Sequence, residues 1–198
     1  MQRLSKSAWT TICLLASVAV IAAQVRELPA GWFRAGSKPA DYEMAVDASA
    51  GRTGPAAFIK ARTPTPAADG FGTLMQQFAS DQYRGKRLRL SGYVKATGIS
   101  NWAGLWMRVD GAGTTPLAFD NMQDRPIKGT QEWKRYEIVL DVPQSAVNIA
   151  FGILLAGPGQ AWLDDLQFEV VANGVPTTDQ MGRASPGAGG PQNLGFDK

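Results

Sequence analysis

The stretch RLRLSGYVKA, residues 87–96, decides the fold class. Every second residue in it is apolar or glycine, and the residues between them are charged, polar or aromatic. One face would carry Leu88, Leu90, Gly92 and Val94, and the other Arg87, Arg89, Ser91, Tyr93 and Lys95. A period of two is that of a β-strand with one face in an apolar core. The pattern therefore predicts a strand over Lys86–Ala96.

Similar short runs recur along the chain, separated by segments rich in Gly, Pro, Asp and Asn. With 22 Gly and 12 Pro in 198 residues, the composition suits a turn-rich β protein. No run combines helical length with a 3.6-residue period. We expect an all-β, two-sheet sandwich of about nine strands. The strands would be Tyr42–Asp47, Ala56–Ala61, Thr73–Phe78, Lys86–Ala96, Gly104–Val109, Pro116–Asp120, Lys134–Asp141, Asn148–Leu155 and Ala161–Val170.

Alternation in the later strands predicts which side chains face the core. In residues 135–142 the inward set is Tyr136, Ile138, Leu140 and Val142. In residues 148–155 it is Ile149, Phe151, Ile153 and Leu155, with the small Ala150 and Gly152 on the other face. In residues 161–171 it is Trp162, Leu166, Phe168 and Val170, and Asp164 has the same parity.

Three segments resemble a known class of domain. They are YRGKRLRLSGYVKA (83–96), GLWMRVDG (104–111) and the region 119–169, which ends in AWLDDLQFE. Together they are similar to the jelly-roll sandwich of galactose-binding-like domains and carbohydrate-binding modules, and the match covers roughly Gly31 to Val171. The resemblance implies a jelly-roll fold and a non-catalytic domain that recognises a carbohydrate or a similar polar ligand. The same fold also serves in domains that bind proteins or lipids, so the fold does not fix the ligand.

The resemblance also implies a structural calcium site. Such sites draw oxygen ligands from an acidic residue near the first strand and an Asp of the last strand. Here Asp164, Asp165 and Glu43 are the candidate metal ligands. Calcium needs about six to eight oxygen ligands. The alternative is that backbone amides hold Asp164 and that Asp165 is solvated.

The candidate binding face comes from NWAGLWMRVDG, residues 101–111. Leu105 and Met107 would face the core, which leaves Trp106 and Arg108 on the opposite face. If the strands pair as in the family, Arg89 and Tyr93 share that face. Aromatic rings stack on the C–H faces of sugars, and Arg, Asn, Gln and Asp hydrogen-bond hydroxyl groups.

Further candidates lie at strand ends, where loops often carry binding groups. Asp120, Asn121 and Gln123 follow the predicted strand at 116–120, and Trp102 lies at the mouth of the next strand back. Each has a structural alternative. Trp106 could be covered, Arg108 could pair with Asp110 or Asp120, the Asp-Asn pair could form a turn, and Trp102 could belong to the core edge.

The N-terminus predicts export. Residues 1–23 carry two cations and an apolar run of 16 residues from Ala8 to Ala23 that ends in small residues. This is the pattern of a signal peptide, and the run is short for a membrane span of roughly 20 residues. An uncleaved leader, which would be the only contact with a membrane, is the alternative. We expect a periplasmic or extracellular protein with an irregular segment at 24–39, the sandwich at 40–172 and a disordered tail at 173–198.

Composition excludes several function classes. The chain has no His and one Cys, which removes imidazole-based catalysis and disulfides within the chain. No G-x-S-x-G, zinc or phosphate-loop motif occurs, so we expect no enzyme, and Asp120 with Asp124 is the only carboxylate pair to check. Without the leader, 18 cations face 17 anions, which gives no basic stripe for a nucleic acid. The alternative to a carbohydrate-binding module is an envelope domain that contacts another protein and has no small ligand.

Overall fold

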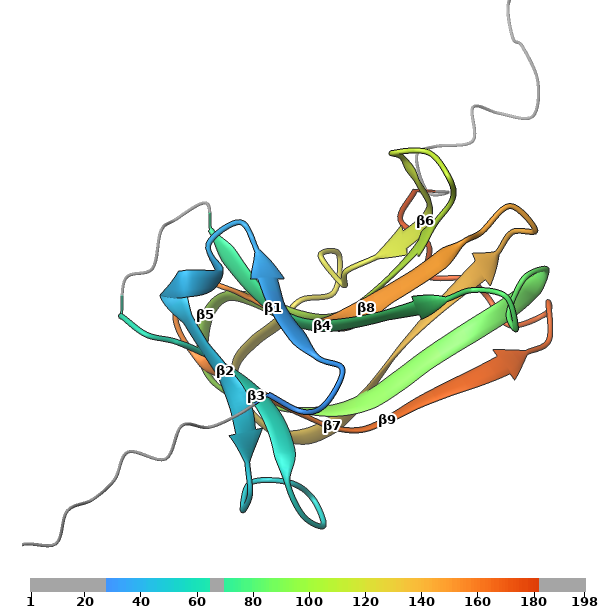
Figure 1. The fold of residues 1–198 in the computed structure, drawn as a ribbon. Helices are drawn as coiled ribbons and strands as arrows, with labels where there is room; N and C mark the ends of the chain where they lie inside the picture. The colour runs from blue at the N-terminus through green and yellow to red at the C-terminus, as the bar shows by residue number, and fades with distance from the viewer. Residues whose placement is uncertain (1–27, 65–69, 182–198) are drawn as a thin grey trace, which may run out of the picture.

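Two stacked β-layers enclose the apolar faces of the strands (Figure 1). The computed structural model describes residues 28–64 and 70–181. The described elements are all β apart from one short 3-10 helix, η1 (Pro39–Asp41). The fold is a jelly-roll sandwich, as the sequence predicts. Its strands are β1 (Phe33–Gly36), β2 (Tyr42–Asp47), β3 (Ala56–Ala61), β4 (Phe71–Ala79), β5 (Lys86–Asp110), β6 (Pro116–Asp120), β7 (Ile127–Val142), β8 (Asn148–Ala156) and β9 (Gln160–Val171).

The 25-residue strand β5 belongs to both layers. Its first half pairs with β7 and β9, and its second half pairs with β8 and β6. The register with β7 shifts between Val94 and Ala103, and Gly98 in this stretch has φ +62°, a value that suits glycine. The strand order β1-β4-β8-β5-β9-β3-β2 thus folds into two layers at the bend of β5.

We call β1, β4, β8, β6 and the second half of β5 the first layer. The second layer contains β2, β3, β9, β7 and the first half of β5. In Figure 1, β4 and β8 lie above β7 and β9, and the core fills the space between. The sequence predicts two strands where the structure has the single strand β5, and it does not predict β1, which pairs with β4 and extends the first layer.

The core confirms most of the predicted inward faces. Leu88, Leu90, Ile138, Leu140 and Ile153 are fully buried in one cluster. Across the second layer, Leu90 lies opposite both Ile138 of β7 and Phe168 of β9, so the three form one row of the core. Cross-strand apolar pairs of this kind stabilise a sheet.

The prediction for β9 is wrong at its start. Asp165 has φ +50°, and the register between β5 and β9 shifts between Ser91 and Tyr93. This irregularity inverts the alternation, so Ala161 and Leu163 face the core before it, and Leu166 and Phe168 face the core after it. Trp162 therefore lies on the outer face. Its indole Nε1 donates to Asp47 Oδ2 at 3.4 Å. Val170, which the sequence places inside, is 49% exposed.

Residues 173–181 pack against the sandwich. The Gln180 amide donates to the Phe119 carbonyl, and the Thr178 amide donates to the Val139 carbonyl, both at 2.8 Å. The prediction of a disordered tail from residue 173 is therefore wrong for residues 173–181. The rest of that predicted tail lies outside the described residues, as does the predicted signal peptide.

Among residues 28–64 and 70–181 we find no helix long and apolar enough to span a bilayer.

Candidate ligand-binding groove

A groove with a volume of about 400 Å³ lies on the outer face of the first layer. Four predicted site residues line it, namely Trp102, Trp106, Arg108 and Asn121. The groove also takes Phe71, Thr73 and Met75 from β4 and Phe119 from β6. Its lining is mainly aromatic and aliphatic, with a few polar groups, which is the usual character of a small-ligand site.

Trp106 forms the base of the groove. Its side chain leaves β5, crosses β8 and reaches β4, where its Nε1 donates to Thr73 Oγ1 at 2.7 Å. The Thr73 hydroxyl in turn donates to the Ile153 carbonyl at 2.9 Å. Trp106 is only 5% exposed and packs with Met75 and Leu154. The ring is therefore fixed in place.

Glycines keep the base of the groove low. Gly152 of β8 lies between Trp106 and Met75 in register. A Cβ at Gly152 would come within 2.2 Å of the Leu74 carbonyl oxygen, and a Cβ at Gly104 within 2.7 Å of the Asn121 carbonyl oxygen. Neither position tolerates a side chain. The adjacent strands approach closely here, and the indole can lie across β8.

Arg108 stands at one side of the groove and pairs with Asp110. Its Nε donates to Asp110 Oδ1 at 2.7 Å and its Nη2 to Asp110 Oδ2 at 3.2 Å. Asp110 Oδ2 also accepts from Asn148 Nδ2 at 3.0 Å. The guanidinium side chain is 40% exposed, so part of it faces solvent. The pairing with Asp110 that the sequence left open is present, and it leaves Arg108 in the groove.

Phe119 and Asn121 form the wall opposite β4. Phe119 pairs with Arg108 across β5 and β6. Both backbone groups of Phe119 bind the C-terminal segment, because its amide donates to Asp179 Oδ1 at 3.0 Å and its carbonyl accepts from the Gln180 amide at 2.8 Å. Asn121 Oδ1 accepts from the Gln123 amide at 3.1 Å. Residues 178–180 thus secure the strand that carries this wall.

The structure does not bring Arg89 and Tyr93 to the groove. Both lie on the first half of β5 and face outward from the second layer, so the expectation that they share a face with Trp106 is wrong. Arg89 pairs with Glu169 at 3.1 Å. The Arg52 guanidinium lies 3.6 Å from the Tyr93 ring centroid and covers it. The bend of β5, which alternation alone does not show, separates the two sets of residues.

Asp120, Gln123 and Asp124 do not line the groove. Asp120 is fully buried on the core side of β6, where it pairs with Arg125 Nη2 at 2.5 Å and accepts from the Met122 amide at 2.8 Å. Asp124 pairs with Arg125 Nη1 at 2.9 Å. Burial lowers the pKa of Arg125, but its hydrogen bonds and charge pairing with Asp120 and Asp124 outweigh this and raise the pKa above its ordinary value. The two carboxylates thus hold a cation between them.

The predicted calcium ligands do not come together. Asp164 Oδ2 accepts from the Arg52 amide at 2.8 Å, and Asp165 Oδ2 pairs with Arg52 Nη1 at 2.5 Å. In the strand register, Glu43 of β2 lies opposite Lys60 of β3, and Lys60 lies opposite Gln160 of β9. That places Glu43 about 13 Å along β9 from Asp164, at 3.3 Å per residue. Among the described residues no group of three acidic, His or Cys side chains could hold a metal ion. The residues do not fit a calcium ion, because backbone amides of Arg52 and Asp165 hold both oxygens of Asp164 and the Arg52 guanidinium pairs with Asp165.

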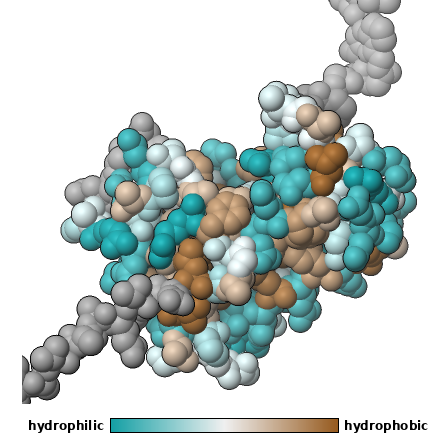
Figure 2. Space-filling model, in the orientation of Figure 1, coloured by the Kyte–Doolittle hydropathy of each residue, from teal (hydrophilic) through white to brown (hydrophobic). Residues whose placement is uncertain are grey.

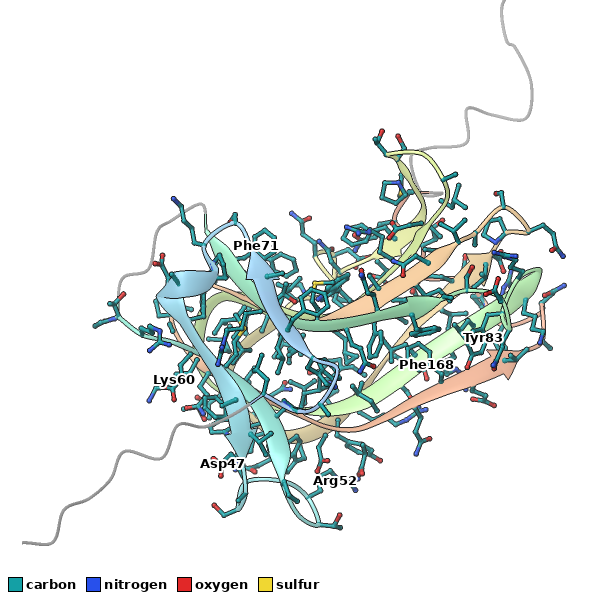
Figure 3. The ribbon with its side chains drawn as sticks, in the orientation of Figure 1. Asp47, Arg52, Lys60, Phe71, Tyr83 and Phe168 are labelled. Carbon is teal, nitrogen blue, oxygen red and sulfur yellow. The ribbon has the colours of Figure 1, made fainter. Side chains whose placement is uncertain are left out.

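Away from the groove, aromatic rings cover the edge of the sandwich between β4 and β9, where no described strand joins the two layers. Figure 2 shows apolar side chains, tan to brown, along this edge. Phe151 lies at the centre, with Trp32 and Phe168 edge-on at 5.4 Å and 4.9 Å between ring centroids. Tyr83 and Phe168 lie at this edge in Figure 3, whereas Phe71 marks the start of β4 beside the groove. Trp32 therefore covers an edge of the core.

The sequence does not predict several of the residues that line the groove. Phe119 alternates with the buried Ala118 in the predicted strand 116–120, so its parity could have marked it as outward-facing. Phe71, Thr73 and Met75 reach the groove only through the register of β4 against β8. The register of two strands cannot be predicted from a single sequence.

The comparisons with solved structures place the fold among carbohydrate-binding modules of the jelly-roll type. The CBM22-1–GH10 modules of xylanase 10B from Clostridium thermocellum, solved with xylohexaose, match with a TM-score of 0.51 and 17% identity over 72% of this chain and 26% of that chain. The CBM22-1 xylan-binding domain of Xyn10C from Paenibacillus barcinonensis matches with a TM-score of 0.50 and 16% identity over 73% of this chain and 88% of that one. A bacteriophage CBA120 tailspike protein matches with a TM-score of 0.52 and 10% identity, over 72% of this chain and 20% of that one.

One curated relative is similar in sequence. It is the uncharacterized HTH-type transcriptional regulator YbfP of Bacillus subtilis, 47% identical over 149 residues, which are 75% of this chain. This chain spans 50% of the length of that relative. No family model matches the chain.

Proposed function

We propose that this protein is an exported, non-catalytic carbohydrate-binding module that binds a saccharide in the groove on its first layer. One observation carries the proposal. A fixed indole, Trp106, forms the base of a groove whose sides present Trp102, Phe71 and Phe119. Such rings offer the flat apolar surfaces on which the C–H faces of sugar rings stack. Arg108 and Asn121 stand beside them as hydrogen-bond donors.

The structural relatives support the class of ligand. One is named a xylan-binding domain, and another was solved with xylohexaose. Their identity to this chain is below 20%, so the sugar itself does not transfer. The fit of the groove to a saccharide rests on its own rings and donors.

A non-catalytic role is consistent with the described carboxylates. Asp120 and Asp124 hold Arg125, and Asp164 and Asp165 hold Arg52. A glycosidase needs two carboxyl groups that flank one bond and remain free to transfer protons. Asp120, Asp124 and Asp165 instead pair with guanidinium groups, and backbone amides hold Asp164.

The regulator of Bacillus subtilis favours a second candidate function. Its 47% identity over 149 residues indicates that a domain like this one forms part of a regulator. A ligand-recognition domain can serve such a protein as a sensor, with the same groove and the same chemistry. The two candidates differ in what the ligand controls and agree on where it binds.

A glycan-array screen of the full chain, with Trp102→Ala as the test variant, decides the proposal. We expect a defined set of glycans to bind the wild-type protein and to lose affinity about 10-fold or more in the variant, because an aromatic residue that contacts the ligand often contributes about 2 kcal/mol or more. Val147→Ala, which replaces an exposed apolar side chain away from the groove, is the matched control. A folded wild-type protein that binds no glycan overturns the proposal. A stable complex with another envelope protein would then support the protein-binding alternative.

A further inference from the structure

The hydrogen-bonding inventory of the groove points to one class of saccharide. We infer that the groove selects sugar rings whose substituent presents an oxygen that only accepts hydrogen bonds, as a uronic acid carboxylate or an acetamido carbonyl does. This inference rests on the proposed function of the same groove. It comes from a comparison of the side-chain donors and acceptors in the groove, of which the protein itself engages the acceptors and leaves several donors unused.

Each side-chain oxygen acceptor in the groove already accepts one hydrogen bond from the protein. Thr73 Oγ1 accepts from Trp106 and donates to a backbone carbonyl. Asn121 Oδ1 accepts from the Gln123 amide. No Asp or Glu occurs among the described lining residues. The nearby Asp110 accepts from both Arg108 and Asn148.

The donors, in contrast, remain available. A guanidinium has five N–H groups, and Arg108 uses two of them on Asp110, so three are left once its contacts with the described part of the chain are counted. Within residues 28–64 and 70–181, the one side-chain hydrogen bond of Asn121 uses Oδ1, which leaves both hydrogens of its Nδ2 for a ligand. The polar side of the groove is therefore a donor surface.

These donors line the same groove. Arg108 faces Phe119 across the β5–β6 pair, and Asn121 is two residues further along on the same face. Diagonal neighbours of this kind have Cβ atoms about 7 Å apart. A saccharide in the groove can therefore present acceptor oxygens to both side chains.

An ordinary sugar hydroxyl fits this surface less well. A hydroxyl carries a hydrogen that also needs an acceptor, and a donor left without a partner in a groove loses free energy. A carboxylate or an acetamido carbonyl presents only lone pairs at this point. The acetamido methyl group would also suit the apolar base around Met75 and Leu154.

Matched oligosaccharides on one backbone test the inference. Cellohexaose, chitohexaose and the hexamer of β-1,4-glucuronic acid share a β-1,4-linked glucose frame and differ in a hydroxyl, an acetamido or a carboxylate substituent. Isothermal titration of the full chain should show at least about 10-fold tighter binding of one substituted hexamer than of cellohexaose, the scale of a lost charged hydrogen bond. Salt separates the two sources, because added salt weakens carboxylate binding and leaves acetamido binding largely unchanged. The same comparison on an array of neutral, acidic and N-acetylated glycans extends it to other backbones.

Asn121→Asp is the decisive variant. It replaces the free NH₂ with an oxygen and keeps the Oδ1 that accepts from the Gln123 amide, so the local turn is retained. We expect the preference for the substituted glycans to fall at least about 10-fold. Arg135→Gln, on the outer face of the second layer, removes a similar charge and should change nothing.

The outcomes separate this inference from the proposed function. Neutral glycans that bind as well as their acidic and N-acetylated counterparts overturn the inference and leave the carbohydrate-binding function in place. A substituent preference that survives in Asn121→Asp also overturns it, provided that thermal unfolding shows the variant to be folded. A protein that binds no glycan at all overturns both.

Discussion

The indole Nε1 of Trp106 donates to the hydroxyl of Thr73 at 2.7 Å, across the whole width of β8. This bond joins three strands of the first layer at the base of the groove. It also gives Trp106 a structural role besides any contact with a ligand. The predictions that follow separate these two roles.

Replacing Thr73 with Val should destabilise the domain. Valine keeps the shape of the side chain but removes the hydroxyl that accepts from the buried Nε1 of Trp106. A buried donor without a partner costs about 1–3 kcal/mol in the free energy of unfolding, which urea denaturation can measure. Thr73→Ser, which retains the hydroxyl, is the control and should lose less. Equal stability of Thr73→Val and the wild type would show that the bond contributes nothing.

Trp102 and Trp106 should respond differently to truncation. Trp106 is 5% exposed, so Trp106→Ala should cost about 3–5 kcal/mol of folding stability and change binding partly through the fold. Trp102 is half-buried at the mouth of the groove, so Trp102→Ala should weaken glycan binding with a smaller loss of stability. Parallel denaturation and binding curves measure both effects. The assignment of roles fails if Trp102→Ala is the less stable of the two.

High pH should destabilise the protein through Tyr42. Burial raises the pKa of this phenol, a hydrogen bond from the Gly157 amide lowers it in part, and Asp41 adds to the rise. Because the folded pKa lies above the unfolded value of about 10, this contribution is complete below pH 10 and is lost as the pH rises through the folded pKa. The free energy of unfolding should therefore fall above pH 10, and less steeply in Tyr42→Phe. An identical alkaline slope in both proteins would contradict this origin.

Calcium should leave the thermal stability unchanged. A ligand that binds only the folded state raises the apparent stability with its concentration, but the Arg52 guanidinium already pairs with Asp165 and backbone amides already hold Asp164. Melting curves with calcium and with a chelator should therefore coincide. Arg52→Ala should lower the melting temperature, because it leaves the Asp165 carboxylate, next to Asp164, without its cation. A calcium-dependent rise in the wild-type melting temperature would show that the metal displaces the guanidinium.

The C-terminal segment should control the exchange of the Phe119 amide. That amide donates to Asp179 Oδ1, and the Phe119 carbonyl accepts from Gln180. The amide exchanges with solvent only when β6 opens locally and this hydrogen bond breaks. In Asp179→Ala the bond is absent, so the amide should exchange faster. Hydrogen exchange measures the effect, and Asp179→Asn, which keeps Oδ1, is the control. Unchanged protection in Asp179→Ala would mean that residues 178–180 do not secure the groove wall.

Alternation was sufficient to predict most of the fold. Period-two patterns place Leu88, Leu90, Ile138 and Leu140 in the core, where the structure has them. They fail where the backbone leaves regular geometry. The left-handed conformation of Asp165 inverts the face of Trp162, and the bend of β5 joins two predicted strands into one. Both depend on local backbone conformation, which residue polarity does not encode.

The site was predictable in part for the same reason. Trp106 and Arg108 lie on the outward face because their parity within one strand sets it. Alternation also groups Arg89 with them, although Arg89 lies 19 positions before Arg108 and the strand changes layer in between. The contribution of β4 depends on its register against β8, which arises from tertiary packing.

The long strand β5 also has a consequence for the order of synthesis. Each of its partners, β6, β7, β8 and β9, follows it in the chain. A nascent polypeptide that ends at Asp110 therefore presents 25 residues of strand without a neighbour. The sandwich can close only after Gln160–Val171 has left the ribosome, because this strand joins β5 to β3. Until then the chain is long, largely unpaired and dependent on contacts distant in sequence, which are the conditions for slow folding.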